Sequence, residues 1–164
     1  MLHTIVHNTT GLIHLISSLA ALVFGTTMLL NSKGTQRHKR IGYAYTISMI
    51  VLNVTAFMIF RLFNRFGPFH FAALISCLTL LAGMIPILLR SRFRSWLALH
   101  MSFMFYSVIG LYAAFASEVI VRVPGIRFWW SVTGATFLVF FVAMYFFRKS
   151  AKKWMIQFSK KSTV

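Results

Sequence analysis

The residues of this chain that could do chemistry are a few histidines and one carboxylate. Glu118 is the only acidic residue among 164, and six histidines are present. Neutral imidazole nitrogens bind haem iron and transition-metal ions, so the histidines are the first candidates for a cofactor site. His3 and His7 precede the first apolar stretch, and we expect them to be solvated. The other four fall within or beside the first four apolar stretches, one to each: His14, His38, His70 and His100.

The order of these four histidines along the chain predicts two pairs. His14 and His70 lie toward one end of the expected helices, and His38 and His100 lie toward the other. Two imidazoles from alternate helices can supply both axial ligands of a b-type haem, in a protein that passes electrons between a quinol, or another donor, and an acceptor. The first pair is better matched in depth, because His38 precedes its apolar stretch whereas His100 lies about one turn inside its own. Hydrogen bonding between helices is the alternative role for all four.

Glu118 lies at the same expected end as His14 and His70. Two histidines and a carboxylate can hold a divalent ion such as zinc or iron, for metal-activated hydrolysis or for metal handling. The alternative is an ion pair between Glu118 and Arg122, four residues later on the same helix face. A third class of function, a transporter-like or accessory subunit without enzymatic activity, leaves the histidines to packing or proton transfer.

The composition excludes an ordinary soluble domain. Hydrophobic residues make up 59% of the chain and charged residues 11%, with a mean hydropathy of +0.77, whereas a soluble domain is about 45–50% apolar and about 25% charged. The net charge of +16 would suggest nucleic acid in a soluble protein, but the basic residues lie between apolar stretches, so we expect a membrane and no nucleic acid. Cys77 is the only cysteine, which excludes a disulfide framework and a CxxC metal site.

Five apolar stretches approach or reach the roughly 20 residues that a membrane-spanning helix needs. We therefore expect an all-α integral membrane bundle in a single domain over 1–164, with a basic tail at 148–164. The expected helices cover residues 12–30, 41–60, 69–89, 96–117 and 128–147. Small and polar residues recur at helical spacing in the first four, which predicts a four-helix core holding the histidines and a peripheral fifth helix. In the second helix this face carries Tyr45 and Asn53, and we expect Asn53 to hydrogen-bond across helices or to bind a ligand.

The basic residues predict how the chain is oriented. Three segments on one side of the expected bundle carry 13 Lys and Arg, whereas the other side carries only Arg61, Arg65, Arg122 and Arg127. Positive residues in short loops favour the cytoplasm, so we expect the N-terminus outside and the C-terminus inside a bacterial cytoplasmic membrane. The histidines at 14 and 70 then belong to the outer face. The basic inner segments are also expected to attract anionic lipid headgroups.

Four local strings carry a family resemblance: KGTQRHKRIGYAY at 33–45, GPFHFAALIS at 67–76, HMSFMFYS at 100–107 and GLYAAFASEVIVRVP at 110–124. With the segment around His14, they resemble a family of bacterial membrane proteins called domain of unknown function 2306, over roughly residues 11–124. The resemblance implies a compact multi-helix membrane protein and assigns no chemistry. The positions that match its motifs are His14, His38, Gly42, Tyr45, Pro68, His70, His100, Glu118 and Arg122. The histidine layout is also similar to that of the cytochrome b561 class of four-helix diheme proteins, which implies one haem near each membrane face.

Overall fold

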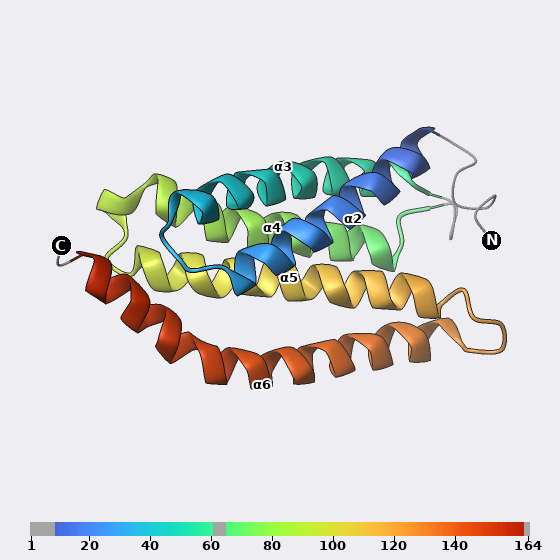
Figure 1. Cartoon of the computed structure of the whole chain (residues 1–164). Coiled ribbons are helices and arrows are strands. Elements are labelled where there is room, and N and C mark those ends of the chain that lie inside the picture. Colours follow the sequence, from blue (N-terminus) through green and yellow to red (C-terminus); the bar gives the residue numbers. More distant parts are fainter. Residues whose placement is uncertain (1–8, 61–64, 163–164) are drawn as a thin grey trace.

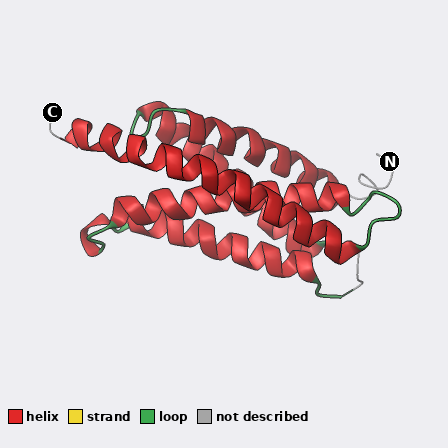
Figure 2. Ribbon diagram, turned by 90° about the horizontal axis from the view of Figure 1, so that it is seen from below, coloured by secondary structure: helices red, strands yellow, loops and turns green. Residues whose placement is uncertain are grey.

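The part of the chain that the structure describes folds into five long helices and one short one and contains no strand (Figure 1, Figure 2). The structure is a computed structural model that describes residues 9–60 and 65–162, with side chains up to residue 150 and at Trp154 and Ile156. The helices are α2 (Thr9–Leu30), α3 (Gln36–Met58), α4 (Pro68–Leu88), the 3-10 helix η1 (Arg90–Arg92), α5 (Trp96–Ile120) and α6 (Phe128–Ser162). His3, His7 and Arg61 lie outside the described residues.

Each of the five long helices is long and apolar enough to cross a membrane, α6 over its first part, Phe128–Ser150. This confirms the prediction of an all-α membrane protein with five spans. Helices suit the bilayer because every backbone polar group in the hydrocarbon is paired within its own segment. Large apolar side chains are exposed on the outside of the helices, among them Val23, Ile47 and Phe141, and in a bilayer these contact lipid.

Most helix boundaries lie within three residues of those expected, and two differ by five or more, each for a local reason. Helix α3 begins at Gln36 rather than at 41, because the Thr35 hydroxyl accepts a hydrogen bond of 3.0 Å from the backbone N–H of His38 and caps the helix ahead of its apolar stretch. Helix α6 continues to Ser162 rather than ending near 147. Its basic extension is rich in lysine, which is a good helix former, so the loss of apolar character does not end the helix.

Four of the helices form a bundle, and the fifth lies outside it. Helices α2 and α4 each pack against both α3 and α5, so α2 and α4 occupy opposite corners, as do α3 and α5. Helix α6 packs against α5 and runs along the outside of the bundle (Figure 1). This is the predicted four-helix core with a peripheral fifth helix. Histidines on alternate helices therefore lie on diagonal corners.

The centre of the bundle is held by close packing around Tyr45, which is fully buried. Its hydroxyl lies 2.8 Å from the Ser107 hydroxyl on α5, in a buried hydrogen bond. Gly25 on α2 lies so close that an added Cβ would meet the Tyr45 ring at 3.0 Å and Val108 at 3.2 Å. Small residues therefore let α2 approach its neighbours, as the sequence pattern predicts for helices in lipid.

Candidate functional site

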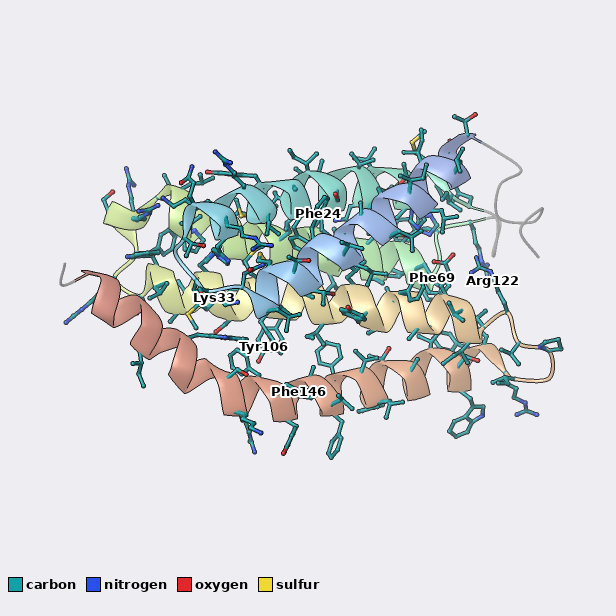
Figure 3. The ribbon with its side chains drawn as sticks, viewed as in Figure 1. Phe24, Lys33, Phe69, Tyr106, Arg122 and Phe146 are labelled. Carbon is teal, nitrogen blue, oxygen red and sulfur yellow. The ribbon has the colours of Figure 1, made fainter. Side chains whose placement is uncertain are left out.

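The histidines lie toward the two ends of the bundle. Helices α3 and α5 begin at the end where α2 and α4 finish. We call this the Lys33 end, and the opposite end the Glu118 end. In Figure 3, Lys33 and Arg122 mark these two ends.

His38 and His100 line one cavity of about 260 Å³ at the Lys33 end. His38 lies in the first turn of α3 and His100 lies one turn from the start of α5, so the two are close in depth. The sequence predicted that His38 and His100 differ in depth. That prediction was wrong, because α3 starts five residues before its apolar stretch and so includes His38. The walls of the cavity are mainly apolar, with Met28, Met101 and Met104 among them.

The hydrogen bonding of His100 determines which of its nitrogens is free. Its Nδ1 lies 2.8 Å from the backbone carbonyl oxygen of Gly83 on α4. A carbonyl oxygen can only accept, so Nδ1 carries the proton and donates it. In the neutral ring Nε2 then carries a lone pair, which is the arrangement typical of a metal-ligating imidazole. The Nδ1 atom of His38 is buried and has no hydrogen-bond partner among the described residues.

The same cavity has a basic rim formed by Lys33, Lys39 and Arg90. The Lys33 Nζ donates to two carbonyl oxygens of the last turn of α2, those of Met28 at 2.7 Å and Leu29 at 2.8 Å. Burial lowers the pKa of Lys33 to about 8. An apolar interior with positive charge at its mouth suits a flat apolar ligand that carries acidic groups at one edge.

A second cavity, of about 330 Å³, lies toward the Glu118 end and is lined by His14, Asn53 and Glu118. The Nδ1 atom of His14 lies 3.0 Å from the Thr55 hydroxyl oxygen on α3. That hydroxyl has one proton, which it directs to the α3 backbone, at 2.8 Å from Val51 O and 2.9 Å from Leu52 O. His14 Nδ1 is therefore the donor to Thr55, and the Nε2 atom of the neutral ring carries the lone pair.

Asn53 lines this second cavity and carries a buried hydrogen-bond donor that is unpaired among the described residues. Its side chain is 4% exposed, and its Nδ2 has no hydrogen-bond partner in the part of the chain that the structure describes. Leaving a buried amide proton unpaired costs roughly 1–3 kcal/mol. Of the two roles expected for Asn53, a cross-helix hydrogen bond from Nδ2 is therefore not found, and the ligand-binding role stays a prediction.

His70 does not line the second cavity and has a local structural role. Its Nδ1 accepts the backbone N–H of Gly67 at 3.2 Å, which caps the start of α4. Its ring also contacts the rings of Phe60 and Phe66, with centroids 4.7 and 4.8 Å away. Because Nδ1 accepts, the proton of the neutral ring sits on Nε2, which is buried without a partner among the described residues. This geometry does not favour His70 as a ligand, and the expected pairing with His14 finds no support.

Glu118 forms an ion pair with Arg122, with 2.7 Å between Oε1 and the guanidinium Nη2, and both side chains are exposed. This is the alternative that the i, i+4 spacing predicted. Within the described residues no three His, Cys, Asp or Glu side chains gather closely enough to hold a metal ion. The expected metal site of His14, His70 and Glu118 is therefore not assembled.

The partners that orient these histidines were missed from the sequence. For Gly83 a signal lay one residue away: Pro86 has no N–H, so the carbonyl of Ala82 loses its helical partner and the backbone bonding of this turn of α4 is disturbed. For His70 the signal was its place three residues after Gly67, the position at which a side chain can reach back to the N-cap amide. Thr55 carried no comparable signal, because its meeting with His14 depends on how α2 and α3 are rotated.

Comparison with known proteins supports the membrane assignment and adds no chemistry. A family model described as "Predicted membrane protein (DUF2306)" matches residues 11–148, most of the chain. Searches against curated proteins and against solved structures give no match. The resemblance to the cytochrome b561 class is thus not confirmed, whereas the resemblance to the family called domain of unknown function 2306 is confirmed. The chain belongs to the DUF2306 family of predicted membrane proteins.

Proposed function

We propose that this protein binds a b-type haem at the Lys33 end and transfers electrons through it, and that His38 and His100 would hold its iron. The observation that carries the proposal is that two histidines on diagonal helices line one apolar cavity at similar depth. His100 is already oriented by Gly83, which leaves Nε2 for the iron. Bis-imidazole ligation is an established way to hold a haem for electron transfer.

The shape and charge of the cavity support a haem that is only partly enclosed. Its volume of about 260 Å³ is just below the roughly 300–1,000 Å³ of typical ligand pockets. A haem held here would be only partly enclosed. Lys33, Lys39 and Arg90, which line the same cavity, could neutralise its propionate carboxylates.

We further propose that the Lys33 end faces the cytoplasm of a bacterial cell. The support is the distribution of Lys and Arg, 13 on that side against four on the other, together with the preference of positive loops for the cytoplasm. The N-terminus is then outside and the C-terminus inside. In this orientation the basic rim of the haem cavity also meets the anionic headgroups of the inner leaflet.

A visible spectrum of the detergent-purified full-length protein tests the haem proposal. For the wild type we expect a Soret band, sharp bands of low-spin haem on reduction, and one haem per chain by extraction. The variants His38→Leu and His100→Leu should lose all three signals. His70→Phe is the matched control, because it removes a buried histidine that lines neither cavity, and it should keep the spectrum. A folded wild-type protein without haem refutes the proposal, and stoichiometric zinc by elemental analysis would favour a metal protein instead.

A further inference from the structure

The second cavity, at the other end of the bundle, carries the strongest unused signal in the molecule. We propose that it binds the ring of a lipid-soluble quinol, whose hydroxyl donates to His14 Nε2 while its other ring oxygen accepts from Asn53 Nδ2. This site goes beyond the haem proposal, because it lies in a different cavity and its test measures binding rather than electron transfer.

The polar groups of the cavity specify the hydrogen bonds that the ligand must make. His14 offers an acceptor, since Thr55 fixes the ring proton on Nδ1. Asn53 offers a donor, because its buried Nδ2 has no partner among the described residues. A matching ligand therefore carries one hydroxyl donor and one oxygen acceptor. The two oxygens of a hydroquinone ring meet both requirements.

The charges around the cavity disfavour other classes of ligand. Glu118 is the only charged side chain in the lining, and no Lys or Arg lines it, so a phosphate or carboxylate ligand would find no partner there. A divalent cation lacks the cluster of three ligands that such ions need, in the part of the chain that is described. A neutral ligand remains. The walls are apolar and aromatic, with Leu52, Leu111 and Phe115 among them, which suits a ring with a hydrocarbon tail.

The position of the cavity explains why the ligand would come from the lipid phase. Ile75 on α4 and Phe140 on α6 both contribute to the lining, and Ile75 is 61% exposed on the lipid-facing surface. The cavity therefore reaches the side of the bundle as well as its interior. Gly110 on α5 also lines it, and a Cβ added at Gly110 would meet no atom within 4 Å. There is open space in the cavity at this position.

Binding of decylubiquinol to the purified full-length protein, under anaerobic conditions, tests the proposal on the wild type. The comparison probe is the dimethyl ether of the same molecule, which keeps the ring and tail but has no hydroxyl donor. We expect saturable binding of the quinol and at least about tenfold weaker binding of the ether, the effect of losing one good hydrogen bond in a buried site. Equal affinities, or no saturable quinol binding, would overturn the proposal and leave an apolar space filled by lipid or detergent.

Variants then assign the contacts. His14→Phe should abolish the preference for the quinol over its ether, whereas Asn53→Leu should weaken both probes about tenfold. Gly110→Leu should block both by filling the open space without touching either polar group. Gly134→Leu is its matched control, since Gly134 on α6 is equally free of neighbours and lines neither cavity. Unchanged quinol binding in Gly110→Leu would place the quinol elsewhere and refute the site. Loss of haem from His38→Leu would not affect this binding test, so the two proposals can fail separately.

Discussion

Replacing Gly25 by valine should destabilise the bundle, and the size of the effect follows from the structure. A Cβ at this position would lie 3.0 Å from the Tyr45 ring and 3.2 Å from Val108, closer than the roughly 3.5–4.0 Å of favourable carbon contacts. Tyr45 and Val108 are both fully buried, so neither side chain has free space to move into. Overpacking of this kind costs about 1–3 kcal/mol, a factor of roughly 5 to 150 in the unfolding equilibrium constant.

The measurement is reversible unfolding in mixed micelles, with helix content followed as the fraction of denaturing detergent rises. Gly134→Val is the control, because it makes the same chemical change where an added Cβ meets nothing within 4 Å. The two variants share the same change in helix propensity, so the difference between their free energies of unfolding reports the packing at Gly25 alone. A difference below about 0.5 kcal/mol would refute the close approach of α2 to Tyr45.

Three further predictions address orientation, titration and His70. A reporter fused to the C-terminus should be active only in its cytoplasmic form, and periplasmic activity would reverse the proposed orientation. Because the folded pKa of Lys33 is about 8, below its ordinary value of 10.5, the unfolded chain binds more protons between these values, so stability should rise as pH increases from about 8 toward 10.5. Lys33→Arg, which stays charged, should lack that rise in the same unfolding assay. His70→Phe should lower the free energy of unfolding by roughly 0.5–2 kcal/mol through loss of its helix cap, and an unchanged stability would contradict the capping role.

The number and order of helices could be predicted because hydropathy alone determines which stretches cross a membrane. The inward faces could also be predicted in part: Ser18, Ala21 and Gly25, which recur at helical spacing, are all buried. The start of α3 could not be read in this way, since it depends on a threonine cap in a polar, basic segment. An error of five residues there was enough to make the pair of His38 and His100 look mismatched.

The roles of the individual histidines depend on three-dimensional contacts that hydropathy does not encode. Three of the four histidines become distinct once the partner of Nδ1 is known, whereas Nδ1 of His38 has no partner among the described residues. In His14 and His100 this nitrogen donates, to Thr55 and to the Gly83 carbonyl, so the lone pair on Nε2 is available. In His70 it accepts, so Nε2 holds the proton and cannot serve as a ligand without losing the cap.

His14 on α2 and His100 on α5, whose Nδ1 atoms both donate, line separate cavities. In both cases a second helix supplies the contact that fixes the tautomer, α3 for His14 and α4 for His100. The packing of the bundle therefore sets the protonation of these two rings, and any ligand that binds at Nε2 should in turn stabilise the helix pairs that hold them.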